Sequence, residues 1–496
     1  MLSRVARLLM ISSEVESLAR TGGLGDMVEA LSRALGAEGV DVVVVTPKYG
    51  VTRVPPGARS WPAPVKAPLG LGHGRELGVV EALLGSGRGA PRACMLSDAE
   101  LFDRAGIYGD EYGTFGDNAF RFATLASGAL SAAEVAFGGA LPDIVHAHDW
   151  HAALALVYAR RARGPRWAGV PLVYTVHNLA YQGVLGAREL PYLGVPEDAW
   201  DDGWMRHEGN VNLMKGAVEI ADAVTTVSET YAREIQHAPH GFGLEAHVRH
   251  HRGKLLGIVN GIDTQSFDPE VDVAIARRYS PANALAGKSA CKEALRRELG
   301  LAADSRAPLF GVVSRLTRLK GSDLLFRVLP GLVERGVQLV VVGTGDASLE
   351  ADLRAAGARF PGRVAARVVF DPLLARRVFA GSDFTVVPSR DEPCGLTQMY
   401  AMRYGAIPLV TPVGGLVDTV VPIDLAHAMG TGVVAAHVDE ASVLLACEEA
   451  LSLWRDPVGL ASVVARAMAR DSSWSRSAER YLGVYERLRA RRPGEG

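Results

Sequence analysis

Short runs of apolar, mostly β-branched residues recur along the whole chain, and most of them end in a polar or glycine-rich turn. Runs of four or five such residues, separated by stretches with helical periodicity, are typical of buried parallel strands. The runs lie at 8–12, 42–45, 143–146, 172–176, 223–227, 309–313, 338–342, 384–387 and 407–410. The repeated order of strand, turn and helix predicts an α/β fold built from doubly wound parallel sheets.

The length of the chain, 496 residues, exceeds what one ordinary hydrophobic core holds and favours two domains. We expect a first domain at 1–254 and a second at 255–474, with the run at 255–259 as the crossing between them. An amphipathic stripe predicts a C-terminal helix within 475–496 that packs back onto the first domain. Two doubly wound domains facing a central cleft are the simplest arrangement.

The charge balance and the cysteine pattern exclude several classes of protein. The chain carries 53 Lys and Arg against 55 Asp and Glu, so no global positive field would hold nucleic acid or an anionic membrane. Its four cysteines lie far apart without a CxxC pair, which argues against a disulfide scaffold and a cysteine zinc site. The apolar run near the N-terminus is too short for a secretory signal or a membrane span. We therefore expect a cytoplasmic protein, and no feature predicts an oligomeric state.

The most informative turn follows the run at 384–387 and reads Pro-Ser-Arg-Asp-Glu-Pro-Cys-Gly-Leu-Thr-Gln from 388 to 398. A helix is expected at 396–404, closed by Gly405. The free N–H groups at the start of such a helix attract anions, and Glu392 would lie beside them. A phosphate and a polar group would meet here. The plainer interpretation is a Pro-rich loop with one exposed acid, which is common in α/β proteins.

Two further turns carry glycines or cations that suit a phosphate. After the first run, the pair Gly22 and Gly23 would let the backbone approach a ligand closely. Arg20 would add the several hydrogen-bond donors of its guanidinium. After the first strand of the second domain, Arg315 and Lys320 would converge on one phosphate. Each turn also has a plainer interpretation, either a tight turn or a pair of solvated surface cations.

Histidines follow two strands of the first domain. The run at 143–146 leads into His146, His148, Asp149 and His151. Such a cluster can bind a metal, but a strand-end loop with Asp149 near its tip supplies polar contacts to a sugar, which we favour. The next run ends in His177. The segment 237–254 holds five more histidines and no carboxylate partner beyond Glu245, which favours a solvated basic loop or a polar helix.

These motifs, in this order, resemble those of the glycogen synthases, the bacterial and plant-starch type of retaining glucosyltransferase. The match spans nearly the whole chain and rests on Thr-Gly-Gly-Leu-Gly-Asp from 21, His-Ala-His-Asp-Trp from 146, Thr-Val-His-Asn from 175, Asn-Gly-Ile-Asp from 260, Ser-Arg-Leu from 314, Lys-Gly from 320 and Glu-Pro-Cys-Gly-Leu from 392. The resemblance implies the GT-B fold, with an acceptor-side and a nucleotide-sugar-binding domain, both Rossmann-like. It further implies transfer of glucose from ADP-glucose to the non-reducing 4-hydroxyl of an α-1,4-glucan, with retention, in glycogen biosynthesis.

The resemblance also implies roles for residues at the matching positions. Arg315 and Lys320 would hold the donor phosphates, so we expect no metal and no cofactor. Glu392 would contact the transferred glucose, with Asp149 and His177 as further catalytic groups. The donor would contact Arg20, Gly22, Gly23, Arg315, Lys320, Asn260, Gly343, Cys394, Gly395, Leu396 and Thr397. The acceptor and the sugar would contact Asp149, His177, Asn178 and Tyr108.

Two positions depart from the family pattern near the expected donor. Arg20 stands where the family usually has lysine, and Asp391 stands where an aromatic residue usually precedes the glutamate. Both bear on the donor, so a transferase of the same fold that uses UDP-glucose or another acceptor stays an alternative. A catalytically silent glucan-binding protein is a second alternative. Binding a polymer alone, however, needs no cradle for a diphosphate such as Arg315 and Lys320.

Overall fold

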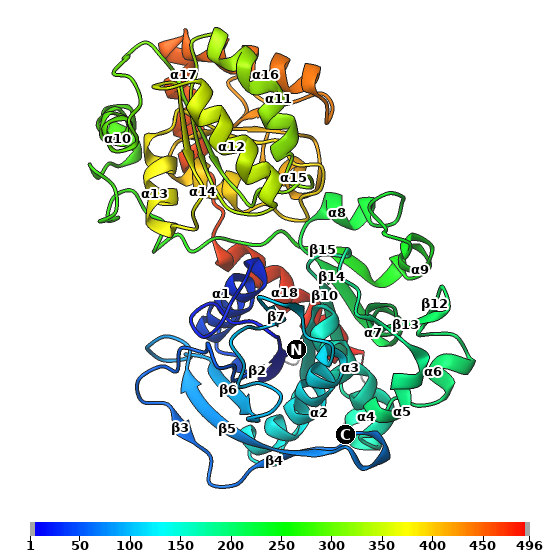
Figure 1. Ribbon diagram of the computed structural model, residues 1–496. Coiled ribbons are helices and arrows are strands. Elements are labelled where there is room, and N and C mark those ends of the chain that lie inside the picture. Colours follow the sequence, from blue (N-terminus) through cyan, green and yellow to red (C-terminus); the bar gives the residue numbers. More distant parts are fainter. Residues whose placement is uncertain (1–4, 492–496) are drawn as a thin grey trace. The chain divides into compact units, whose positions relative to one another are not determined.

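The computed structural model describes residues 5–491, which divide into two compact units (Figure 1). The first unit holds the chain up to residue 227, residues 232–261 and the chain from 474 onward. The second holds residues 228–231 and 262–473. The first unit therefore continues to residue 261, beyond the boundary expected at 254, because the run after that boundary pairs into its sheet.

One large sheet forms the first unit, in the order β15-β14-β10-β9-β1-β2-β6-β5-β3, with β4 paired to β5. In this order, all the neighbouring strands from β15 through β6 pair parallel. Strands β3 and β4 pair antiparallel with β5, and β5 pairs antiparallel with β6. Strands β3, β4 and β5 therefore extend one edge of the sheet. The bounds are β1 Arg7–Ile11, β2 Asp41–Pro47, β3 Arg59–Ser60, β4 Val65–Ala67, β5 Arg75–Leu83, β6 Arg92–Ser97, β9 Ile144–His148, β10 Leu172–Val176, β14 Ala223–Thr226 and β15 Leu255–Gly257.

Helices cover both faces of this sheet. Helices α1 (Gly23–Ala37) and α18 (Trp474–Ala490) share one core with the strands, and Met95 of β6 points into that core. The neighbouring Leu96 points the other way, where Gly128 of α2 (Asn118–Ala136) lies over it. The C-terminal helix thus packs back onto the first unit as predicted, and the Tyr485 hydroxyl reaches His146 at 2.8 Å.

The second unit has a six-stranded, fully parallel sheet in the order β18-β17-β16-β19-β20-β21. Its strands are β16 Leu309–Val313, β17 Gln338–Val342, β18 Val364–Arg367, β19 Phe384–Val387, β20 Ile407–Val410 and β21 Val433–Val434. Its main helices are α10 Ala284–Leu299, α11 Ser322–Glu334, α12 Ala347–Arg359, α13 Pro372–Gly381, α14 Thr397–Arg403, α15 Gly414–Thr419, α16 Glu440–Trp454 and α17 Pro457–Ala469. The four strands predicted for this unit are all confirmed.

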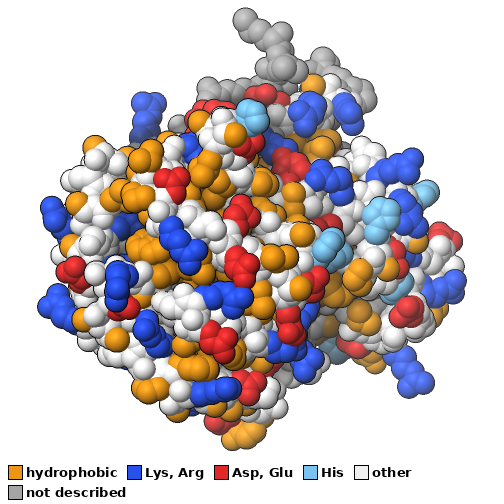
Figure 2. Space-filling model, turned by 90° about the horizontal axis from the view of Figure 1, so that it is seen from above, with side chains coloured by type: hydrophobic (Ala, Val, Ile, Leu, Met, Phe, Trp, Pro, Cys, Tyr) orange, Lys and Arg blue, Asp and Glu red, His pale blue; other side chains and the backbone are white. Residues whose placement is uncertain are grey.

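The surface charges are mixed, as the nearly equal numbers of basic and acidic residues predict, and the cysteines form no disulfides. On the face drawn in Figure 2, basic and acidic side chains are interspersed rather than gathered into areas of one sign. All four cysteines are buried and carry free thiols. Within residues 5–491, no helix is both long enough and apolar enough to span a membrane.

Candidate active site

The residues singled out in the sequence fall on both units, and most of them follow the carboxyl ends of parallel strands. The first unit carries Arg20, Gly22, Gly23, Tyr108, Asp149, His177, Asn178 and Asn260. The second carries Arg315, Lys320, Gly343, Glu392, Cys394, Gly395, Leu396 and Thr397. Each unit therefore carries its own set of candidate residues.

A buried carboxylate shapes the glycine loop of the first unit. Glu14 follows β1 closely and is 3% exposed. Its oxygens accept hydrogen bonds from the Thr21 N–H at 2.6 Å, the Thr21 hydroxyl at 2.9 Å and the Gly22 N–H at 3.1 Å. The Tyr108 hydroxyl donates to the same carboxylate at 2.5 Å. The Gly22 N–H, expected to face donor phosphates, therefore faces Glu14 instead.

Packing does not explain the glycine at position 22. A Cβ added to Gly22 would meet no atom within 4 Å, and its φ of −157° is open to any residue. Gly23 begins α1, so its N–H belongs to the unpaired first turn of a helix. The space beside this turn is consistent with close approach of a ligand to the backbone.

Arg20 is held by acids of its own loop and helix. Its guanidinium pairs with Asp26 of α1, and it lies 3.3 Å from Glu16. Burial raises the pKa of Asp26, an effect that the neighbouring Arg20 opposes. The expected contact between Arg20 and a donor phosphate would therefore compete with these carboxylates.

Asp149 ties the ends of β9 and β10 together. It is the first residue of α3 (Asp149–Val157) and has a φ of 55°, in the left-handed region that non-glycine residues rarely adopt. Its Oδ1 accepts the backbone N–H of His177 at 2.8 Å. Burial raises the pKa of Asp149 to about 7, although the N–H groups of His177 and Asn178 act against this shift. The two strand ends predicted to carry catalytic groups are thus in direct contact.

The two histidines of β9 differ in how far protein groups satisfy them, since Nε2 of His148 is buried and has no hydrogen-bond partner among the described residues. Both ring nitrogens of His146 are in contact, one with the Tyr485 hydroxyl and the other with Thr175 at 2.6 Å. Nδ1 of His148 lies 3.1 Å from Nε2 of His177, whose pKa is lowered by burial to about 3. Among the described residues, no group of metal-ligand geometry includes these side chains. The His177 imidazole is therefore neutral near pH 7 and suited to a hydrogen bond with a sugar hydroxyl.

Replacing Asp149 with asparagine is expected to change how stability depends on pH. Because the folded-state pKa lies above the ordinary 3.8, the folded chain holds a proton that the unfolded chain releases between these values. Wild-type stability should therefore fall as pH rises from about 4 to about 7. The amide still accepts the His177 N–H, and asparagine tolerates a positive φ.

Melting curves at pH 5 and pH 8 measure this effect. The stability lost between the two pH values should shrink by about 1–3 kcal/mol in Asp149→Asn. The exposed Asp103→Asn serves as the control, and it should reproduce the wild-type difference. An unchanged difference in Asp149→Asn would show that this carboxyl group does not titrate in that range.

In the second unit, Glu392 and Lys320 form an ion pair. Lys320 Nζ lies 2.5 Å from Glu392 Oε1, and Ser389 donates to Glu392 Oε2 at 2.9 Å. The Ser389 carbonyl in turn accepts from the Thr411 hydroxyl at 2.5 Å. The loops after β16, β19 and β20 are thereby joined. The side chains of Lys320 and Glu392 are only 18% and 11% exposed, so solvent screens the pair little.

Arg315 differs from Lys320 in having no partner. It is exposed, and its guanidinium makes no hydrogen bond or ion pair with any of residues 5–491. The loop that carries Arg315 packs closely against Gly343, because a Cβ at Gly343 would lie 1.8 Å from the Ser314 carbonyl oxygen. The backbone of Leu316 also pairs with the Gly343 loop, donating to Thr344 at 2.9 Å. Gly343 thus sets the position of the Arg315 loop.

The turn from 392 to 397 lies against two helix starts. Gly395 has a φ of 71°, which favours glycine, and α14 begins at Thr397. The N–H of Gly415, in α15, donates to the Glu392 carbonyl at 3.0 Å. A Cβ at Gly415 would lie 1.9 Å from the Cys394 carbonyl oxygen, so only glycine permits this contact.

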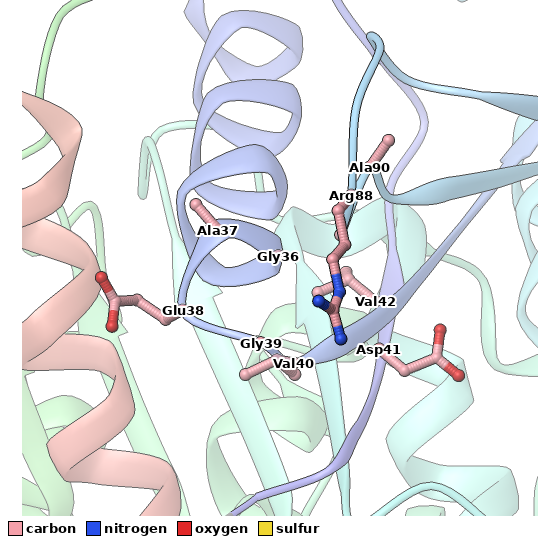
Figure 3. Close-up of a pocket in the computed structure, with 10 residues that line it drawn as sticks. Gly36, Ala37, Glu38, Gly39, Val40, Asp41, Val42, Arg88 and Ala90 are labelled. Carbon is pink, nitrogen blue, oxygen red and sulfur yellow. The ribbon is translucent and has the colours of Figure 1, made fainter.

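A separate hollow of about 550 Å³ lies in the first unit (Figure 3). It is lined by residues 36–42, where α1 ends and β2 begins, and by 88–90. The site residues follow the carboxyl ends of strands, whereas this hollow lies at the amino end of β2. The carbonyl end of α1 disfavours a phosphate there. We therefore assign the hollow no part in the candidate site.

Three residues that hold polar groups in place in the two units were not predicted from the sequence. Glu14 was not recognised as the acceptor of the glycine loop, although an acid directly after a buried strand was a usable signal. Ser389, as a support for Glu392, had no distinctive pattern. The segment 237–254 was expected to lack a carboxylate partner beyond Glu245, yet Glu219 lies 2.9 Å from His251. The expected polar helix is present as α9, but its partner Glu219 was missed because it comes from a different helix.

Comparisons with known proteins agree along the whole chain. A family model described as the starch synthase catalytic domain matches residues 7–250, and one described as glycosyl transferases group 1 matches residues 307–452. The glycogen synthase of Anaeromyxobacter dehalogenans strain 2CP-C is 43% identical over 97% of this chain and 99% of its own. That of Myxococcus xanthus strain DK1622 is 42% identical over 97% of this chain and 99% of its own.

Solved structures give the same result. The catalytic domain of starch synthase IV from Arabidopsis thaliana, bound to ADP and acarbose, has a TM-score of 0.88 at 30% identity, covering 99% of this chain and 100% of that one. Sucrose-phosphate synthase from Thermosynechococcus elongatus has a TM-score of 0.61 at 19% identity, covering 98% of this chain and 99% of that one. The second likeness concerns the fold alone.

Proposed function

We propose that this chain, which belongs to the glycogen and starch synthase family and has its GT-B fold, transfers glucose from ADP-glucose to an α-1,4-glucan. Membership of the family makes it a glucosyltransferase; the donor, the acceptor and the residue roles are the proposal. One observation carries it. Lys320 and Glu392 meet at the strand ends of the second unit, in a chain whose full-length relatives are named glycogen synthases.

ADP-glucose is the donor that the comparisons favour. The starch synthase structure at 30% identity is described as bound to ADP. The acceptor we propose is the 4-hydroxyl at the non-reducing end of glycogen, in keeping with the names of the relatives. The four free thiols support a reducing cytoplasm as the compartment.

The second unit would stabilise the departing diphosphate. Negative charge grows on that group as the glycosidic phosphate bond breaks, so fixed cations stabilise the transition state more than the ground state. Arg315 has a guanidinium ready for phosphate oxygens, and Lys320 would share its ammonium between phosphate and Glu392. We propose that these two cations do this without a metal ion. Glu392 would accept hydrogen bonds from hydroxyls of the transferred glucose.

The first unit would contribute the acceptor side. Asp149 fixes the backbone of His177, and the neutral His177 imidazole is suited to hydrogen-bonding the glucose. Retention through a covalent intermediate would need a carboxylate on the far face of the sugar. Glu392, bonded to Lys320 and Ser389, is a poor nucleophile for that task. We therefore propose a same-face route, in which the departing phosphate takes the proton of the acceptor hydroxyl.

Release of ADP and of UDP, measured with each nucleotide sugar and glycogen in the presence of a chelator, tests the proposal. We expect ADP-glucose to be used at least about tenfold faster, with growth of α-1,4 chains and no loss of rate on chelation. Faster release of UDP would favour the alternative donor. A rate that returns only with a divalent ion would contradict the metal-free roles of Arg315 and Lys320.

The silent glucan-binding alternative gives a different result. Such a protein would bind glycogen in a sedimentation assay yet release neither nucleotide. A chain with no turnover on either donor, but with intact folding by circular dichroism, would therefore replace the proposed function with glucan binding.

A further inference from the structure

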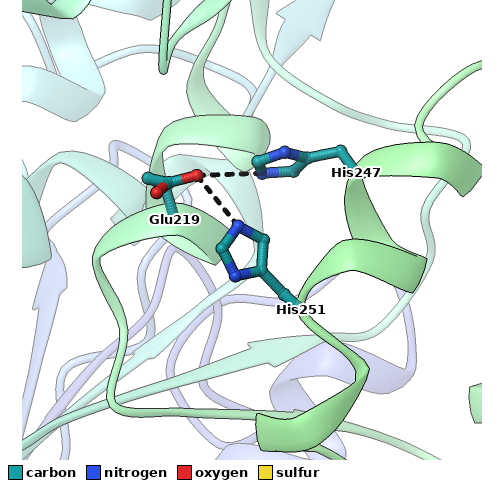
Figure 4. A group of neighbouring side chains, drawn as sticks. All are labelled: Glu219, His247 and His251. Carbon is teal, nitrogen blue, oxygen red and sulfur yellow. Dashed lines mark hydrogen bonds and ion pairs between the residues drawn. The ribbon is translucent and has the colours of Figure 1, made fainter.

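Three potential metal ligands meet on the first unit outside the candidate site (Figure 4). Glu219 lies in α7 (Leu213–Ile220), while His247 lies in α9 (Glu245–His250) and His251 directly follows that helix. The two histidines are four residues apart, so they project from the same side of the helix. One ligand atom from each of the three residues lies within 4.8 Å of the others.

The separations between these atoms suit a tetrahedral ion. Nε2 of His251 lies 2.9 Å from Oε2 of Glu219, and Nε2 of His247 lies 3.9 Å from the same oxygen. Ligand atoms bound to zinc at about 2.0–2.1 Å stand about 3.3–3.4 Å apart in a tetrahedron. The two separations lie on either side of that value, so small side-chain rotations would bring both nitrogen–oxygen pairs to it.

Neighbouring cations do not occupy the site. Lys215 Nζ donates to the carbonyls of Gly203 and Arg206, at 2.6 and 2.9 Å. Lys254 Nζ donates to the backbone carbonyls of Glu219 and Ala221, both at 2.8 Å. Both ammonium groups are therefore held by the backbone, and the Glu219 carboxylate is left to the two imidazoles.

The ligands also have suitable charge and exposure. The side chains of His247 and His251 are each 14% exposed, and that of Glu219 is 40% exposed, so an ion could enter from solvent. Burial lowers the pKa of both His247 and His251. Neutral imidazole is the form that binds metals.

We propose that Glu219, His247 and His251 bind one divalent transition-metal ion of the zinc class, with water in the fourth position. The ligand atoms would be Glu219 Oε2 and the two Nε2 atoms. Nε2 of His247 contacts the Lys215 carbonyl at 3.1 Å, so metal binding would replace that contact and move the ring proton to Nδ1. Two imidazoles favour zinc over magnesium or calcium, which prefer sets of oxygens. The ion would join α9 to α7 just before β15, and this site is separate from the residues proposed for glucosyl transfer.

Metal binding by the full-length protein tests the proposal. Protein stripped with a chelator is titrated with Zn²⁺ against a chromogenic indicator, and Co²⁺ is added as a spectroscopic probe. Wild type should bind one ion per chain and show the intense visible bands of four-coordinate cobalt. His247→Ala and His251→Ala should bind at least about 100-fold more weakly. His250→Ala, on the same helix but exposed and outside the cluster, is the matched control and should bind as wild type does.

A second measurement covers variants that fold poorly. Glu219→Gln keeps the shape of the side chain and can still accept a hydrogen bond from His251 but loses the charged ligand. Saturating Zn²⁺ should raise the Tm of wild type by about 5 °C and leave that of Glu219→Gln unchanged. Failure of wild type to take up one ion, or equal uptake by all the variants, would overturn the site and leave a hydrogen-bonded carboxylate–imidazole cluster.

Discussion

Arg315→Ala should lower kcat for glucosyl transfer by roughly 10²–10³-fold while leaving the fold intact. The guanidinium is exposed and forms no ion pair or hydrogen bond within the described residues 5–491, so its removal breaks no contact there. A loss of activity in this variant would therefore report the missing interaction with the diphosphate. Because that interaction grows as the bond breaks, kcat should fall more than KM rises.

Steady-state kinetics with ADP-glucose and a melting curve together measure the effect. Arg318→Ala is the matched control, since it removes an exposed arginine from the same loop. We expect the control to keep wild-type kcat and both variants to keep wild-type Tm. Turnover by Arg315→Ala within about threefold of wild type would remove Arg315 from the proposed machinery.

The strands and their exits were predictable because their signals are local. A run of β-branched residues followed by glycine or a polar residue is visible within ten positions, and β1, β9, β10, β16, β17, β19 and β20 all appear where such runs lie. The positions of Glu392 and Lys320 after such runs were predictable for the same reason. Helix α18 was likewise visible in its apolar stripe.

The partners of these residues were not predictable, because they depend on strand order. Lys320 and Glu392 are brought together only because β16 and β19 are neighbours in the sheet. The Glu219 carboxylate reaches His251 only through the packing of α9 near α7, which no local pattern encodes. The run at 255–259 was taken for a crossing, but its register against β14 places it in the first sheet.

Local chemistry also did not predict the buried acid beside the glycine turn. The Gly22 N–H was expected to face a phosphate, as glycine-rich turns often do. In the structure the carboxylate of Glu14 accepts that N–H and both donors of Thr21. An internal anion thus holds this turn. Gly23 begins α1, so its N–H lies in the first turn of that helix, where backbone N–H groups have no partner within the helix.

Glu392→Gln should lower kcat by roughly 10²–10³-fold and also destabilise the second unit. The amide keeps the shape of the side chain and the hydrogen bond from Ser389, but it leaves the Lys320 ammonium without its counter-charge. Removing one partner of a buried ion pair costs about 3–5 kcal/mol, and the 18% exposure of Lys320 reduces that cost. The two effects must be separated before the loss of activity is assigned to chemistry.

A double-mutant cycle with Lys320→Met separates them. Met removes the charge but fills the space of the lysine stem, so the double variant leaves no charge unpaired. Its loss of stability should be smaller than the sum of the two single losses by about 1–3 kcal/mol. Its activity should stay as low as that of the single variants, because neither the diphosphate nor the glucose regains a partner. Recovery of activity together with stability would mean that the pair only supports the loops, and the catalytic role of Glu392 would then be lost.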